Sequence, residues 1–67
     1  MAITLKAARV NKSLTQDEAA RLIGINKSTL QKYEAGKHFP DIPVLKRIER
    51  TYGVSYADLI FLIPENA

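Results

Sequence analysis

Apolar residues recur every three or four positions along most of this 67-residue chain, as they do on one face of an amphipathic helix. No stretch alternates apolar and polar residues in the manner of a half-buried strand. The pattern therefore predicts an all-α domain of five helices without a sheet. The helices are expected at residues 4–12, 15–24, 26–35 and 41–53, with a short fifth helix beginning near residue 55.

Polar and glycine residues at the ends of these segments support the boundaries. Thr15 and Glu18 are spaced as a capping box, in which each side chain bonds a backbone N–H of the other. Gly24 ends that helix, because glycine takes the left-handed conformation without steric strain. By the same reasoning, the other boundary residues are Thr4, Asn26 and Asp41 as N-caps, Gly53 as a helix end, and Ser55 with Asp58 as a second capping box.

The apolar positions that share helix faces form the expected core. The two alanines of the second helix are small, so another helix can approach it closely. The residues expected to point inward are Leu5, Ala8, Ala19, Ala20, Ile23, Leu30, Tyr33, Ile42, Leu45, Ile48 and Tyr52. Ala7 is a further candidate for the inner face of the first helix.

The segment 26–35 carries a polar and cationic face on the side opposite its apolar one. At about 100° per residue, four of its side chains fall within one arc of about 140°: Lys27, Ser28, Gln31 and Lys32. Lysine donates well to guanine O6 and N7, and serine bonds base edges adaptably. Two short helices joined by a tight turn at Gly24 suit the DNA major groove, where Lys27 and Lys32 would favour guanine. The alternative is that both lysines are simply solvated on an exposed helix face.

Composition narrows the alternatives. A net charge of +3 permits a polyanion partner, and 46% apolar with 25% charged residues fits one globular domain over residues 1–67. The absence of cysteine, a single His38 and the lack of a phosphate-binding glycine loop argue against an enzyme, a metal site or a cofactor. The sequence contains no apolar run long enough for a secretory signal or a membrane span, so a cytoplasmic protein is expected.

The stretch LTQDEAARLIGINKSTLQKYEAGKHFP, followed by GVSYADLI, resembles the helix-turn-helix family of phage repressors and Cro, which also occurs in many small bacterial regulators. The resemblance covers about residues 5–60, with the motif at 15–35, and departs from the family at Ser13, where glycine is common. It implies a five-helix repressor-like domain that binds double-stranded DNA. The implied form is a homodimer, at least on DNA, that places the helix at 26–35 in the major groove of a two-fold symmetric operator.

The resemblance also implies roles for individual residues. Lys27, Ser28 and Lys32 match positions that contact bases, and Gln31 is a weaker candidate for such a contact. Gln16 matches a position that contacts either a phosphate or a base, and Asn26 and Lys37 match positions that contact the DNA backbone. Arg9 and Glu34 match two positions that often form a buried ion pair between the first and third helices.

Two classes of function remain open at this point. The first is a sequence-specific transcriptional regulator, a repressor that acts by occupying its operator. The alternative is an antitoxin-like or other protein-interaction module on the same fold, which would use apolar residues such as Leu22, Phe39 and Phe61. The apolar run 60–63 either closes the core against the first helix or forms a dimer contact through Phe61 and Ile63. Neither a membrane nor a small-molecule ligand is expected as a partner.

Overall fold

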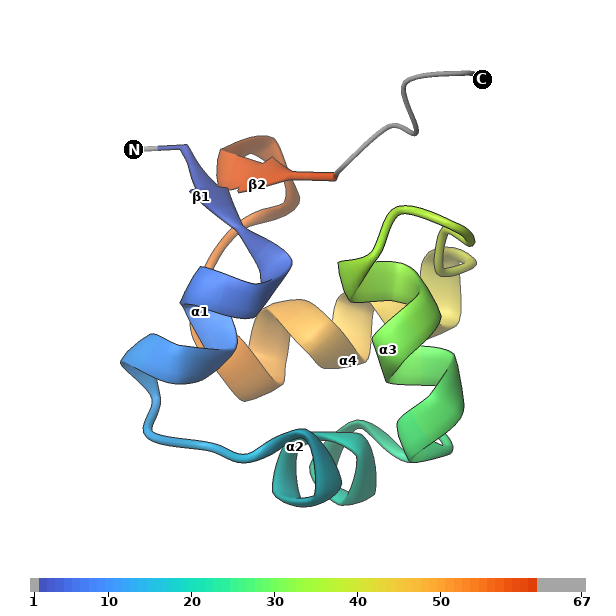
Figure 1. Ribbon diagram of the computed structural model, residues 1–67. Helices are drawn as coiled ribbons and strands as arrows, with labels where there is room; N and C mark the ends of the chain where they lie inside the picture. Colours follow the sequence, from blue (N-terminus) through green and yellow to red (C-terminus); the bar gives the residue numbers. More distant parts are fainter. Residues whose placement is uncertain (1, 62–67) are drawn as a thin grey trace.

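A computed structural model describes residues 2–61 of the chain (Figure 1). Within this range it contains four α-helices, which are α1 (Leu5–Asn11), α2 (Gln16–Ile23), α3 (Lys27–Glu34) and α4 (Ile42–Tyr52). Two short strands, β1 (Ile3–Thr4) and β2 (Leu59–Ile60), pair in parallel, and a 3₁₀ turn (Tyr56–Asp58) precedes β2. In Figure 1, α4 crosses the middle of the domain and the other three helices are arranged around it.

The helix boundaries follow the local signals in the sequence. Thr4 accepts a hydrogen bond from the backbone N–H of Ala7 at the start of α1. The Thr15–Glu18 capping box is present in both directions, at 3.1 and 2.9 Å. The bond from the Thr15 backbone N–H to the Glu18 carboxylate lowers the pKa of Glu18. Helices α2 and α4 both end at a left-handed glycine, as predicted.

Ser13, after the end of α1, is a non-glycine residue with a positive φ, at 57°. An L-residue rarely adopts this left-handed region because its Cβ crowds the backbone. Glycine, which has no Cβ, would take this conformation without that strain.

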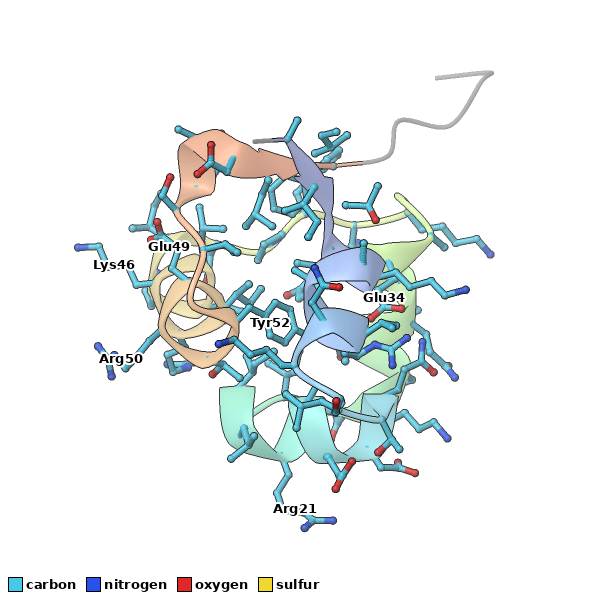
Figure 2. The ribbon with its side chains drawn as sticks, turned by 90° about the vertical axis from the view of Figure 1, so that its left-hand side faces the viewer. Arg21, Glu34, Lys46, Glu49, Arg50 and Tyr52 are labelled. Carbon is cyan, nitrogen blue, oxygen red and sulfur yellow. The ribbon has the colours of Figure 1, made fainter. Side chains whose placement is uncertain are left out.

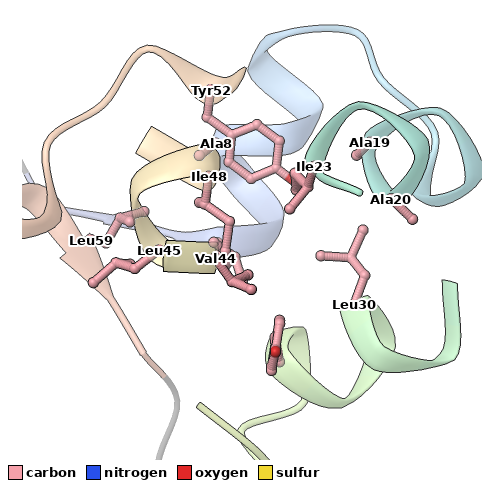
Figure 3. Packing of buried hydrophobic residues seen from close by; sticks show 12 residues of the cluster. Ala8, Ala19, Ala20, Ile23, Leu30, Val44, Leu45, Ile48, Tyr52 and Leu59 are labelled. Carbon is pink, nitrogen blue, oxygen red and sulfur yellow. The ribbon is translucent and has the colours of Figure 1, made fainter. Parts of the chain in front are cut away.

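The core lies where the four helices meet (Figure 3). Its largest fully buried side chains are those of Tyr52, Ile23, Leu30 and Ile48. Ala19 and Ala20 are also buried, and their small side chains let the backbone of α2 pack closely against its neighbours. All but one of the predicted inward-facing residues are buried, the further candidate Ala7 is half-buried, and the core gains Val44 and Leu59.

The exception is Ile42, whose side chain is 63% exposed. It is the first residue of α4, three positions before Leu45, and helical spacing alone put it on the inner face. Its side chain instead lines an open groove, whereas Val44 is buried in the core.

The prediction of a fifth helix and no sheet is wrong. The segment after α4 makes only the 3₁₀ turn, and Ser55 does not bond a backbone N–H there. The backbone N–H of Tyr56 instead donates to the Glu49 carboxylate of α4 at 2.7 Å. The chain then extends, so that Leu59 is buried while Ile3 and Thr4 pair with Leu59 and Ile60. Strands of two residues are too short to show an alternating sequence pattern.

One buried polar atom of the core stands out. The Tyr52 hydroxyl is buried and has no hydrogen-bond partner among the described residues. The ring lies in the core with Ala8 and Ile23 (Figure 3). Burial, with a smaller contribution from the Glu34 carboxylate, raises the pKa of Tyr52 to about 12. An unpaired buried hydroxyl opposes folding, because it gives up its hydrogen bonds to water.

We expect Tyr52→Phe to stabilise the domain by about 1 kcal/mol near neutral pH, because it removes that hydroxyl and keeps the ring. The substitution should also reduce the decrease in the free energy of unfolding at alkaline pH. A tyrosine of the unfolded chain ionises near pH 10, whereas folded Tyr52 keeps its proton to about pH 12. The difference between the two pKa values therefore costs no stability below about pH 10, and it lowers the stability of the parent as the pH rises from 10 toward 12. Urea unfolding across this range tests both effects, and a variant less stable than the parent near neutral pH would contradict them.

Candidate nucleic-acid interface

Helices α2 and α3 form a helix-turn-helix whose turn is fixed by several hydrogen bonds. Gly24, at φ 86°, donates to the carbonyl of Ala20 at 2.8 Å, and Ile25 donates to the same carbonyl at 3.0 Å. The Arg47 Nε of α4 donates to the carbonyl of Ile23 at 2.8 Å. Arg47 thus ties the end of α2 to α4. The sequence carries no local signal for this contact, because the two residues are 24 positions apart.

The outer face of α3 presents the four residues predicted to contact bases. Leu30 and Tyr33 are buried on the inner side of the helix. On the other side, all four of the predicted residues are exposed: Lys27, Ser28, Gln31 and Lys32. The structure therefore brings these side chains together on one accessible helix face.

A shallow hollow of about 300 Å³ runs along the end of this face, and Lys37 lines it with Ser28, Gln31 and Lys32. Lys37 is held there because its backbone N–H donates to the carbonyl of Lys32 at 2.9 Å, after the left-handed turn at Gly36. Lys37 thus lies beside α3, the helix that carries Lys27 and Lys32.

The start of α3 differs from the prediction. Asn26 occupies the N-cap position with an extended backbone, but its side chain makes no capping hydrogen bond. The neighbouring Lys27 Nζ lies 3.5 Å from the Asp17 carboxylate of α2. Both of these side chains are about half or more exposed, so this ion pair is weak and does not prevent Lys27 from reaching another anion.

The ion pair expected between α1 and α3 is present. Arg9 Nε donates to Glu34 Oε2 at 2.7 Å, and the two side chains are only 11% and 7% exposed. The second oxygen of Glu34 accepts from Arg9 Nη2 at 3.3 Å, and Arg9 Nη1 donates to the carbonyl of Leu14 at 2.9 Å. The hydrogen bond with Glu34 raises the pKa of Arg9, so the guanidinium stays charged. The pair fixes α3 against α1 and against the segment before α2.

Gln16, at the start of α2, extends this cluster toward the exposed face of α3. Its Nε2 donates to Glu34 Oε1 at 3.1 Å, and its Oε1 accepts from Gln31 Nε2 at 3.3 Å. Gln16 was predicted to contact DNA, and its two internal hydrogen bonds were not predicted. No sequence signal joins Gln16 to Gln31, because they lie 15 positions apart and on different helices.

A second surface feature is an apolar groove of about 460 Å³ between the loop after α3, the outer side of α4 and the segment that contains the 3₁₀ turn. Phe39 and Phe61 meet edge to face in it, with ring centroids 6.0 Å apart. Ile42 and Tyr56 line the groove and are exposed. Phe61 is half-buried and packs against the core, whereas Ile63 lies outside the described residues.

The helix-turn-helix family model matches residues 5–59. The chain belongs to this family. It is 34% identical over 84% of its length to the cryptic phage CTXphi transcriptional repressor RstR of Vibrio cholerae, and it covers 50% of that protein. It is 29% identical over 98% of its length to an uncharacterized HTH-type transcriptional regulator of Methanothermobacter thermautotrophicus, covering 96% of it. It is 34% identical over 84% of its length to antitoxin PezA of Streptococcus pneumoniae, covering 35% of that protein.

The chain thus spans about half of RstR and about a third of PezA. No solved structure gives a significant match. Between residues 2 and 61, no helix is long and apolar enough to cross a bilayer. The same residues include no group of three or more histidines and carboxylates placed to hold a metal ion.

Proposed function

We propose that this helix-turn-helix protein is a sequence-specific DNA-binding regulator, a repressor that occupies its operator with α3 in the major groove. The observation that carries the proposal is the exposed face of α3, where Lys27, Ser28, Gln31 and Lys32 lie together opposite the buried Leu30. An α-helix with its side chains is about 10–12 Å across, and the major groove is about 12 Å wide. Lysine and serine on such a face bond to base edges.

Contacts to the DNA backbone would come from the ends of the helices and from the loop. Because the side chain of Asn26 makes no capping bond, the N–H groups of the first turn of α3 are available to a phosphate oxygen. Gln16 lies at the start of α2, and Lys37 lies beside the exposed face of α3. These contacts set the position of α3 on the duplex, whereas the α3 side chains read the bases.

We further propose that the protein binds DNA as a homodimer through the apolar groove. Phe39, Ile42 and Tyr56 expose apolar surface there, and Lys46 and Glu49 line the same groove. A two-fold axis through such a surface brings like patches together and lets a lysine of one copy face a glutamate of the other. Binding to successive turns of the major groove requires the two α3 helices of such a dimer to lie about 34 Å apart. Such a regulator would work in the cytoplasm of a bacterium or a phage-infected host.

A protein-interaction function is the second candidate, and the same groove supports it. One relative is named an antitoxin, and an exposed apolar groove is a typical site for a protein partner. Leu22 on α2 adds a separate exposed apolar side chain. In this alternative the groove, rather than the face of α3, would carry the function.

Selection from a pool of random duplexes at near-physiological salt tests the proposed function. We expect enrichment of a two-fold symmetric motif with half-site centres about 10 base pairs apart, because a dimer presents two α3 helices in successive turns of the major groove. A motif with a single half-site would retain the DNA-binding proposal and contradict the dimer. Binding without any enriched motif, lost uniformly as salt rises, would contradict sequence-specific binding and favour the protein-interaction alternative.

A further inference from the structure

The buried ion pair sets the orientation of an exposed amide through a relay of hydrogen bonds. A carboxylate accepts hydrogen bonds and cannot donate them. Glu34 Oε1 therefore requires the NH₂ group of Gln16, which lies 3.1 Å away. This turns Gln16 Oε1 toward Gln31, so that Gln31 must present its own NH₂ group, at 3.3 Å. The direction of each bond thus follows from the Glu34 carboxylate, which is paired with Arg9.

The relay limits the hydrogen-bonding groups of Gln31 that remain free to contact DNA. One N–H of its amide is used by Gln16, which leaves one N–H donor and the Oε1 acceptor. In the major groove, adenine presents an acceptor at N7 and a donor at N6, whereas guanine presents acceptors at both N7 and O6. One donor with one acceptor matches adenine. Against guanine, the Oε1 atom would face another acceptor.

We propose that Gln31 reads an A·T pair in the operator and that Gln16 is the positioning residue that fixes its amide for this contact. The inference rests on the proposed function, since it assumes that α3 lies in the major groove. It gives Gln31 a different preference from its neighbours, because Lys27 and Lys32 have only donors to offer and suit guanine. It also assigns Gln16 a role in specificity in addition to any contact with phosphate.

The test is duplex selection followed by competition binding at each position of the motif, with the full chain and four single variants. Gln31→Ala should abolish the preference for A·T over G·C at one position of each half-site, a change of roughly 5- to 140-fold. Gln16→Ala should weaken the preference at that same position, because the Gln31 amide is then free to turn. Asn11→Ala removes another exposed helix amide and should leave the whole motif unchanged. Gln31→Lys should shift the position toward G·C.

The outcomes separate this inference from the proposed function. If the parent protein enriches no motif, the proposed function fails. If the parent motif is clear but Gln31→Ala leaves every base preference intact, the assignment of Gln31 is overturned. If Gln31→Ala relaxes one position while Gln16→Ala lowers affinity equally for all sequences, Gln16 only contacts phosphate and the relay is overturned. Melting temperatures close to that of the parent in all variants show that the changes report on recognition rather than folding.

Discussion

Replacement of Arg9 by methionine is expected to destabilise the domain by about 3 kcal/mol, because it leaves Glu34 charged, buried and without its cation. The change also removes the hydrogen bond from Arg9 to the carbonyl of Leu14. A domain of this size is stable by only roughly 3–10 kcal/mol, so the loss is a large part of the total. The melting temperature should fall by roughly 12–24 °C. DNA binding should fall with it, because the pair holds α3 against α1.

Two further variants make this prediction specific. Arg9→Met combined with Glu34→Leu removes both charges and should be clearly more stable than Arg9→Met alone, since no buried charge is left unpaired. Asp17→Ala breaks the exposed ion pair with Lys27 and should change stability by less than about 1 kcal/mol. Thermal unfolding followed by circular dichroism measures all three. An unchanged melting temperature in Arg9→Met would show that the pair contributes nothing to holding α3.

Replacement of both Lys27 and Lys32 by alanine is expected to weaken operator binding by roughly 100-fold or more, because each contact with a base contributes about 1–3 kcal/mol of discrimination. Both side chains are exposed, so the folded domain should remain intact. Lys37→Ala, by contrast, should weaken binding to all sequences alike and reduce the salt dependence of log K by about 1. Fluorescence anisotropy with operator and scrambled duplexes at several salt concentrations distinguishes these effects.

The matched control for the loss of charge is the double replacement of Arg21 and Arg50 by alanine. Both side chains are exposed and point away from the domain in Figure 2, on α2 and α4. An equal loss of affinity in the two double variants would mean that net charge alone drives binding, which would contradict recognition by α3. If a protein partner exists, the lysine variant should still bind it, because the apolar groove is untouched.

The relation between sequence and structure differs from one part of the chain to another. Thr15, Glu18 and Gly24 fixed the ends of α2 in advance, because caps and left-handed glycines act within a few residues of one another. The exposed face of α3 was also predictable, since helical periodicity determines which residues share a side. The pairing of Arg9 with Glu34 came from the family resemblance, because no local rule joins residues 25 positions apart.

Only the tertiary structure decided the remaining features. Ile42 has the spacing of a core residue and is nevertheless exposed, because burial depends on which elements lie over that end of α4. Ser55 and Asp58 have the spacing of a capping box, yet Glu49 bonds the Tyr56 N–H and the chain extends to place Leu59 in the core. The relay from Glu34 through Gln16 to Gln31 joins α2 and α3 and exists only once they pack together. The sequence thus determined the caps of α1, α2 and α4 and the faces of the helices, which depend on neighbouring residues. Packing between distant segments decided the β1–β2 pair and the amide relay.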